Sequence, residues 1–148
     1  MPSKTIVELI KYSDALSNRE MMKWALRNIR DVLDLLDPVF ANDEHYHLMV
    51  IETNRFLMGS HSVSHMRNQA LKMHEVARHE QDEIRLNLLR AYGHVIATAH
   101  VKEHALHASE YAVKALRAAK IEETTIEGLT KNQNATLEAL AQFIISID

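Results

Sequence analysis

The chain has 148 residues, with 17 Lys and Arg against 20 Asp and Glu, a formal charge of −3, and no Cys. The absence of Cys excludes disulfides, thiolate metal sites and a Cys nucleophile. Acidic residues slightly outnumber basic ones, so the composition does not indicate a basic surface for nucleic-acid binding. Three Gly and two Pro leave few chain-breakers, which predicts one all-α domain over residues 1–148.

The N-terminal half predicts four helices in chain order. KTIVELIKYSDAL reads as a short leading helix, and the next helix has Asn18 as its expected N-cap and ends before Pro38. A third helix begins after Asn42 or Asp43 and ends at Gly59, and a fourth covers SHSVSHMRNQALKMHEVARHE. The start of the chain has no secretory cleavage signal, and no segment approaches the ~20 apolar residues that span a bilayer. We therefore expect a cytoplasmic protein without membrane contact.

The longest uninterrupted helical pattern runs from Gln81 to Lys120 and contains only Gly93 as a weak point. It is apolar on two sides, which is typical of a helix in the middle of a bundle. A bend between Val101 and Ala105 is compatible with it, because average helices are much shorter. The tail adds one or two closing helices, so we expect five to seven helices around a long His- and Ala-rich central helix.

Ten of the residues are His, and the central helix concentrates several of them. His100, His104 and His107 are spaced i, i+4 and i+7, so their rings share one helix face and are candidate ligands for a divalent transition metal. No H-E-x-x-H or E-x-x-H element accompanies them. The alternative is that each ring is a hydrogen-bonded core group, with no metal and no other cofactor.

Other polar residues have simpler explanations. His61 with His65, and Glu75 with His79, are i, i+4 pairs among polar neighbours, which favours solvated helix faces. His74 lies on an apolar edge and is a candidate to meet the later histidines. Glycine-rich phosphate loops and nucleophile elbows are absent from the sequence, so no catalytic residue is predicted.

Arg90 and Tyr111 fall on the same helix face as the central histidines. A guanidinium in that position must be paired or reach solvent. Glu75 is its candidate carboxylate partner, and His74 and Glu75 are the first candidates to satisfy the histidine rings.

The stretch RAYGHVIATAHVKEHALHASEYAVKAL, residues 90–116, closely resembles the signature of small all-α bacterial immunity proteins of the Imm5-like type. KWALRNIRDVLDLLD and IETNRFLMGSHSVSHMRNQALKMHEVAR resemble two further helices of that family, so the likeness covers roughly residues 23–117. The polar residues of the shared signature are His74, Arg90, His94, His100, His104 and Tyr111.

The sequence also departs from the family pattern. Asn28 and Asp34 replace a Cys and a Pro, His45-Tyr46-His47 replaces an R-P-R segment, and the family's Trp-containing C-terminal element is not recognisable. His107 falls outside the shared signature, which weakens the three-histidine metal hypothesis. If the altered segments contact the partner, partner specificity differs here.

The resemblance implies a protein that binds and neutralises a co-encoded toxin without catalysis, with that toxin as its protein partner. Two alternatives stay open at the level of the sequence. One is a metal-binding or metal-dependent bundle that uses His100, His104 and a third His such as His107 or His74. The other is a structural or regulatory homodimer or larger homo-oligomer whose histidines form a pH-sensitive network.

Overall fold

The computed structural model describes residues 6–147, with side chains from Glu8 to Phe143, and over this range the chain is all-helical without a strand. The helices are α1 (Ile6–Ser13), α2 (Asn18–Leu33), α3 (Pro38–Ala41), α4 (Glu44–Leu57), α5 (Val63–Arg78), α6 (Glu83–Ala97), α7 (His104–Ala118) and α8 (Glu123–Ile147). Residues 4 and 5, where the leading helix was expected to begin, lie outside the described part. The all-α bundle is confirmed, and its eight described helices exceed the five to seven predicted.

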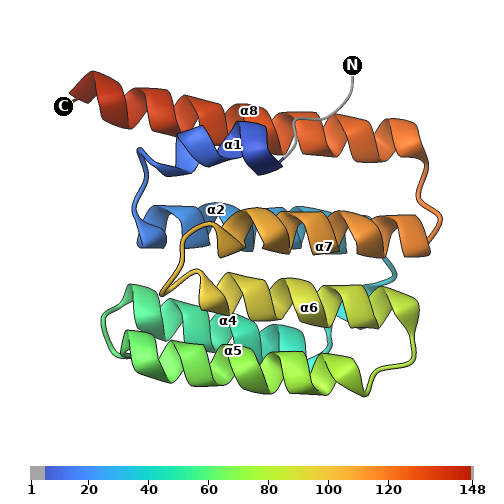
Figure 1. Cartoon of the computed structure of the whole chain (residues 1–148). Coiled ribbons are helices and arrows are strands. Elements are labelled where there is room, and N and C mark those ends of the chain that lie inside the picture. Colours follow the sequence, from blue (N-terminus) through green and yellow to red (C-terminus); the bar gives the residue numbers. More distant parts are fainter. Residues whose placement is uncertain (1–5, 148) are drawn as a thin grey trace.

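Figure 1 shows the helices stacked in layers with their axes nearly along one direction. α8 and α1 lie side by side at one side of the molecule, α2 and α7 form the next layer, and α4 and α5 lie at the opposite side. α6 packs against α7, α5 and α4. Its apolar residues are consequently buried on several sides: Leu88, Leu89, Tyr92, Val95 and Ile96. The central helix that the sequence predicted is therefore α6 alone.

The helical pattern from Gln81 to Lys120 is not one continuous helix: the chain turns after Ala97, close to the bend considered between Val101 and Ala105, and folds back as α7 against α6. The Asn18 side-chain amide donates hydrogen bonds to the carbonyl oxygens of Thr98 (3.0 Å) and Ala99 (3.2 Å). Carbonyl groups at a helix end have no partner within the helix, so such donors stabilise the termination. The break thus depends on a residue 80 positions away, which local periodicity does not reveal.

Asn18 is available for this contact because it is not the N-cap of α2, contrary to prediction. Ser17 is the cap: its Oγ accepts from the Glu20 amide (3.1 Å), and a Glu20 carboxylate oxygen accepts from the Ser17 amide (2.9 Å). This reciprocal pair is a capping box. Asp43 caps α4 as expected, since its carboxylate accepts from the His45 amide at 2.7 Å.

The closing helix α8 is joined to the bundle by a buried tryptophan of α2. Trp24 is 3 % exposed, and its Nε1 donates to the carbonyl oxygen of Gln133 at 2.9 Å. On the same helix the Asn28 amide donates to the Ser109 hydroxyl of α7 at 3.0 Å. α2 therefore holds α7 and α8 in place. Among the described helices, none is both long and apolar enough to cross a membrane.

Candidate functional site

A cluster of half-buried histidine rings lies where α5, α6 and α7 meet. His94 belongs to the last turn of α6 and His104 is the first residue of α7, and their Nδ1 atoms lie 2.9 Å apart. One of the two nitrogens must carry a hydrogen and the other a lone pair, so at least one of the two rings is neutral, and when both are neutral they are opposite tautomers. The hydrogen bond closes the α6–α7 hairpin.

The His94 ring is enclosed by aromatic neighbours on two sides. The His74 ring of α5 meets it edge-on, with centroids 5.0 Å apart and planes at 71°. The Tyr111 ring of α7 stacks on it at 5.3 Å and 11°. Gly93 makes room for this packing, because a Cβ atom there would lie 2.6 Å from Cε1 of His74. His74 therefore rests directly on the backbone of α6.

The surroundings keep these imidazoles uncharged. Burial, reinforced by the neighbouring His74, His104 and His107, lowers the pKa of His94 to about 3. Burial is also the main reason why the pKa values of His74 and His104 are lowered. A neutral imidazole can act as both donor and acceptor, as in the bond between His94 and His104, and needs no counter-ion.

The remaining residues of the predicted polar core lie around these rings. The His100 ring comes from the α6–α7 turn and lies 5.5 Å from that of His104, and its buried Nδ1 has no hydrogen-bond partner. Lys114 places its ammonium group 4.5 Å from the centre of the Tyr111 ring. Arg90 is half-buried and forms no ion pair with any residue that the structure describes, although its charge contributes to the lowered pKa of His74.

The candidate metal set of His100, His104 and His107 does not converge on one point. His100 lies before α7 in the turn, so the assumed i, i+4, i+7 register of a single helix does not exist. The centroids of His104 and His107 are 6.3 Å apart, and these three residues are not among the described groups whose ligand atoms lie within metal-holding distance. The break after Ala97 is the physical reason.

Glu75 is not the partner of the histidine rings or of Arg90. Its carboxylate is 57 % exposed, pairs with Arg78 and lies 3.1 Å from Nε2 of His79. The hydrogen bond with His79 and the charge of Arg78 lower the pKa of Glu75. Glu75 and His79 thus occupy a solvated helix face, as the sequence predicted.

The prediction of a solvated face for His61 and His65 is wrong. Glu52 of α4 is buried, with a side chain only 10 % exposed, and its Oε2 lies 2.7 Å from Nε2 of His65 and 3.1 Å from Nε2 of His61. The two imidazole centroids are 4.0 Å apart. Sequence reasoning missed this group because Glu52 precedes the turn and the two histidines follow it. Gly59 and the helix-capping Ser62, which mark a tight helical hairpin, were the available signal.

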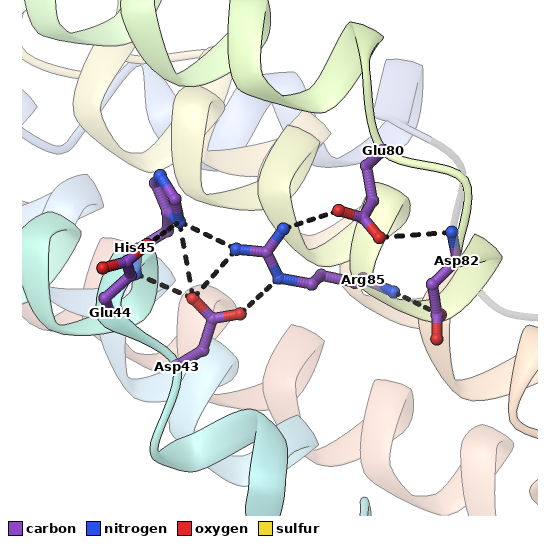
Figure 2. A network of polar contacts seen from close by, with 6 residues as sticks. All are labelled: Asp43, Glu44, His45, Glu80, Asp82 and Arg85. Carbon is purple, nitrogen blue, oxygen red and sulfur yellow. Dashed lines mark hydrogen bonds and ion pairs between the residues drawn. The ribbon is translucent and has the colours of Figure 1, made fainter.

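A second charged group joins the start of α4 to α6 and to the turn between α5 and α6 (Figure 2). Arg85 of α6 donates from Nη1 to Glu80 (2.6 Å), and from Nε and Nη2 to Asp43, with the Nη2 contact at 3.2 Å. Its Nη2 also lies 2.8 Å from Nδ1 of His45. Burial alone raises the pKa of Asp43, but hydrogen bonds and charge from Arg85 hold it below its ordinary value. This network fixes where the α4–α5 layer sits on α6.

Comparison with known proteins identifies a family. The model of a protein family described as "Imm-5 like putative immunity protein" matches residues 11–141, which extend from within α1 to within α8. No curated protein and no solved structure is significantly similar to this chain. The family match includes both the histidine cluster and the Glu52 group.

Proposed function

The chain belongs to the Imm-5 like immunity protein family, and from this premise we propose that it binds and neutralises a cognate protein toxin without catalysing a reaction. The match across residues 11–141 is the observation that carries the proposal. In this proposal the chain protects the cell that makes it by covering the surface that the toxin needs for its activity. The proposal requires no cofactor.

The protonation state and the enclosed position of His94 in the histidine cluster support a role without catalysis. A general acid or base works best with a pKa near the ambient pH and with direct access to its substrate. The pKa of His94 is lowered to about 3, and its ring lies between those of His74 and Tyr111. Such a group is suited to holding helices in one arrangement, and a preformed scaffold reduces the entropy lost on binding a partner.

We propose the outer face of α4 and α5 as the toxin-binding surface. This layer lies at one side of the molecule (Figure 1) and carries exposed apolar side chains: Ile51 at 47 %, Met58 at 79 % and Leu71 at 61 %. A few apolar anchors supply most of the energy of a typical protein interface. The alternative candidate for the toxin-binding surface is on α8, at the opposite side of the molecule, where Phe143 is 61 % exposed.

The test begins with the gene adjacent to the one that encodes this chain. Its product should arrest growth when expressed alone, and co-expression of the chain should restore growth and yield a stoichiometric complex in light scattering. Ile51→Asp or Leu71→Asp should abolish rescue, whereas Phe143→Asp should leave it intact. The reverse pattern would move the interface to α8. A neighbourhood without a toxin gene, together with purification that recovers no stoichiometric partner or only a homodimer, would refute the proposal.

The absence of catalysis needs a separate measurement. Toxin released from the complex by denaturant and refolded should have an unchanged mass and full activity, because occlusion leaves no covalent trace. A released toxin that is permanently inactive, with an altered mass, would show that the chain is an enzyme.

A further inference from the structure

We propose that Glu52, His61 and His65 form a binding site for a divalent transition-metal ion, with Zn²⁺ as the representative. This group, called the α4–α5 site below, is separate from the histidine cluster, and its test below does not depend on the proposed toxin binding. Its three ligand atoms all lie within 4.8 Å of one another. Imidazole nitrogen and carboxylate oxygen are ordinary zinc ligands, and three protein ligands with one open position are a common zinc arrangement.

The distances fit an ion after a small expansion. Zinc lies about 2.0–2.1 Å from each ligand, so ligand atoms of a tetrahedral site are about 3.3 Å apart. Oε2 of Glu52 already lies 2.7 Å from Nε2 of His65 and 3.1 Å from Nε2 of His61. All three ligand atoms lie within 4.8 Å of one another, and lengthening the two short contacts by about 0.2–0.6 Å would bring them to the spacing of a tetrahedral site.

The polar contacts of the site are incomplete without a cation. The Glu52 side chain is 10 % exposed, and within the described chain its ion-pair partners are the two histidines. Only His65 has hydrogen-bond geometry toward it. Nε2 of His61 is buried without a hydrogen-bond partner, although it faces the same carboxylate oxygen. A buried polar atom without a partner is costly, and a metal ion would satisfy the nitrogen and the carboxylate together.

The backbone holds the three ligands in place before any metal binds. Gly59, at φ 84°, ends α4, and its amide donates to the Phe56 carbonyl at 2.9 Å. Ser62 then starts α5, since its Oγ accepts from the His65 amide at 3.0 Å. Glu52 therefore comes from α4, His61 from the turn and His65 from the first turn of α5. A metal here would link two helices that each pack mainly against α6.

The local electrostatics distinguish this site from other histidine pairs in the chain. Glu75 and His79 also place a carboxylate 3.1 Å from an imidazole, but they are 57 % and 78 % exposed and have no third ligand. His94 and His104 share a hydrogen bond, but no carboxylate is bonded to either in the described chain. Among the described residues, only the α4–α5 site combines a buried carboxylate with two imidazoles, whose side chains are 19 % exposed for His61 and 36 % for His65.

The experiment uses full-length protein made without a polyhistidine tag. Titration with Zn²⁺ against a chromophoric chelator should give one ion per chain. At 100 times Kd the thermal midpoint should rise by about 5–10 °C, as expected for ligand binding to a folded domain of this size. In nitrogen-detected NMR of the wild type, the Nε2 signals of His61 and His65 should shift on metal addition, and those of His94 and His104 should not.

Two variants and two controls locate the ion. His61→Gln and His65→Gln should each weaken binding by more than about 100-fold, because losing even an outer-shell partner costs about 10- to 100-fold. His79→Gln and His104→Gln should bind as the wild type does. Wild-type protein that binds no tighter than His65→Gln, or NMR shifts confined to the histidine cluster, would overturn the proposal. The wild-type NMR result decides the matter even if a variant does not fold.

Discussion

Replacing Gly93 with Ala tests whether His74 rests directly on the backbone of α6. The new Cβ atom would lie 2.6, 2.7 and 2.9 Å from three atoms of the His74 ring, so the ring must move away from its position beside His94. Overpacking of this kind costs about 1–3 kcal/mol. Ala in place of Gly within a helix gains about 1 kcal/mol. We therefore expect Gly93→Ala to lower the free energy of unfolding by about 1 kcal/mol.

The same substitution should have the opposite sign when the ring is removed. In a His74→Ala background the clash is absent, so Gly93→Ala should raise the free energy of unfolding by about 1 kcal/mol through helix propensity alone. Gly128 on α8 is the matched control, because a Cβ atom there meets nothing within 4 Å. Gly128→Ala should stabilise the protein by up to about 1 kcal/mol in either background.

Urea unfolding followed by circular dichroism measures all of these variants, with an unchanged m-value as the check that only stability differs. The double-mutant cycle isolates the interaction between positions 74 and 93. If Gly93→Ala stabilises the wild type as Gly128→Ala does, or if its effect does not change sign in the His74→Ala background, the close contact between α5 and α6 does not exist.

Further predictions concern the rings, the helix break and the charged network. Because the folded-state pKa of His94 lies at about 3 against 6.5 for an ordinary imidazole, stability should be independent of this group above pH 6.5 and fall as the pH falls toward 3. His94→Gln should reduce that acid-dependent loss in urea unfolding, and equal slopes would contradict the assignment. Asn18→Ala should lower the free energy of unfolding by about 1–2 kcal/mol, since two carbonyl oxygens lose their donor. The same substitution at Asn54, which is exposed, should leave the free energy of unfolding nearly unchanged. Arg85→Ala should cost about 2–3 kcal/mol because it leaves the Asp43 carboxylate, 11 % exposed, without its guanidinium; a loss below 1 kcal/mol would show that the network is not stabilising.

The sequence was sufficient for the fold class and for most helices, because amphipathic spacing and end signals are local properties. Gly59 ends α4, and Asp43 begins it, as predicted. A bend between Val101 and Ala105 was compatible with the sequence, but the complete turn between α6 and α7 was not predictable from local spacing. The donor that satisfies the free carbonyls there is the Asn18 side chain of a distant helix.

The histidine positions show the same limit. A helical wheel correctly indicates which residues share a face only if the helix is continuous, and His100, His104 and His107 were grouped on that assumption. The structure brings His94 and His104 together across a hairpin instead. Asp43 and Arg85 are 42 positions apart, so their network had no local signal at all.

The two histidine groups described above differ in whether a carboxylate lies among the rings. Around His94, burial, the neighbouring imidazoles and the charge of Arg90 lower the pKa of the ring, so this group stays neutral and stacks on Tyr111. Around Glu52 a buried negative charge faces two imidazole nitrogens, of which only one has hydrogen-bond geometry. A neutral cluster needs no ion, whereas a buried carboxylate must be compensated. If the chain binds a metal, the buried charge therefore favours the α4–α5 site, even though the sequence directs attention to the longer run of histidines.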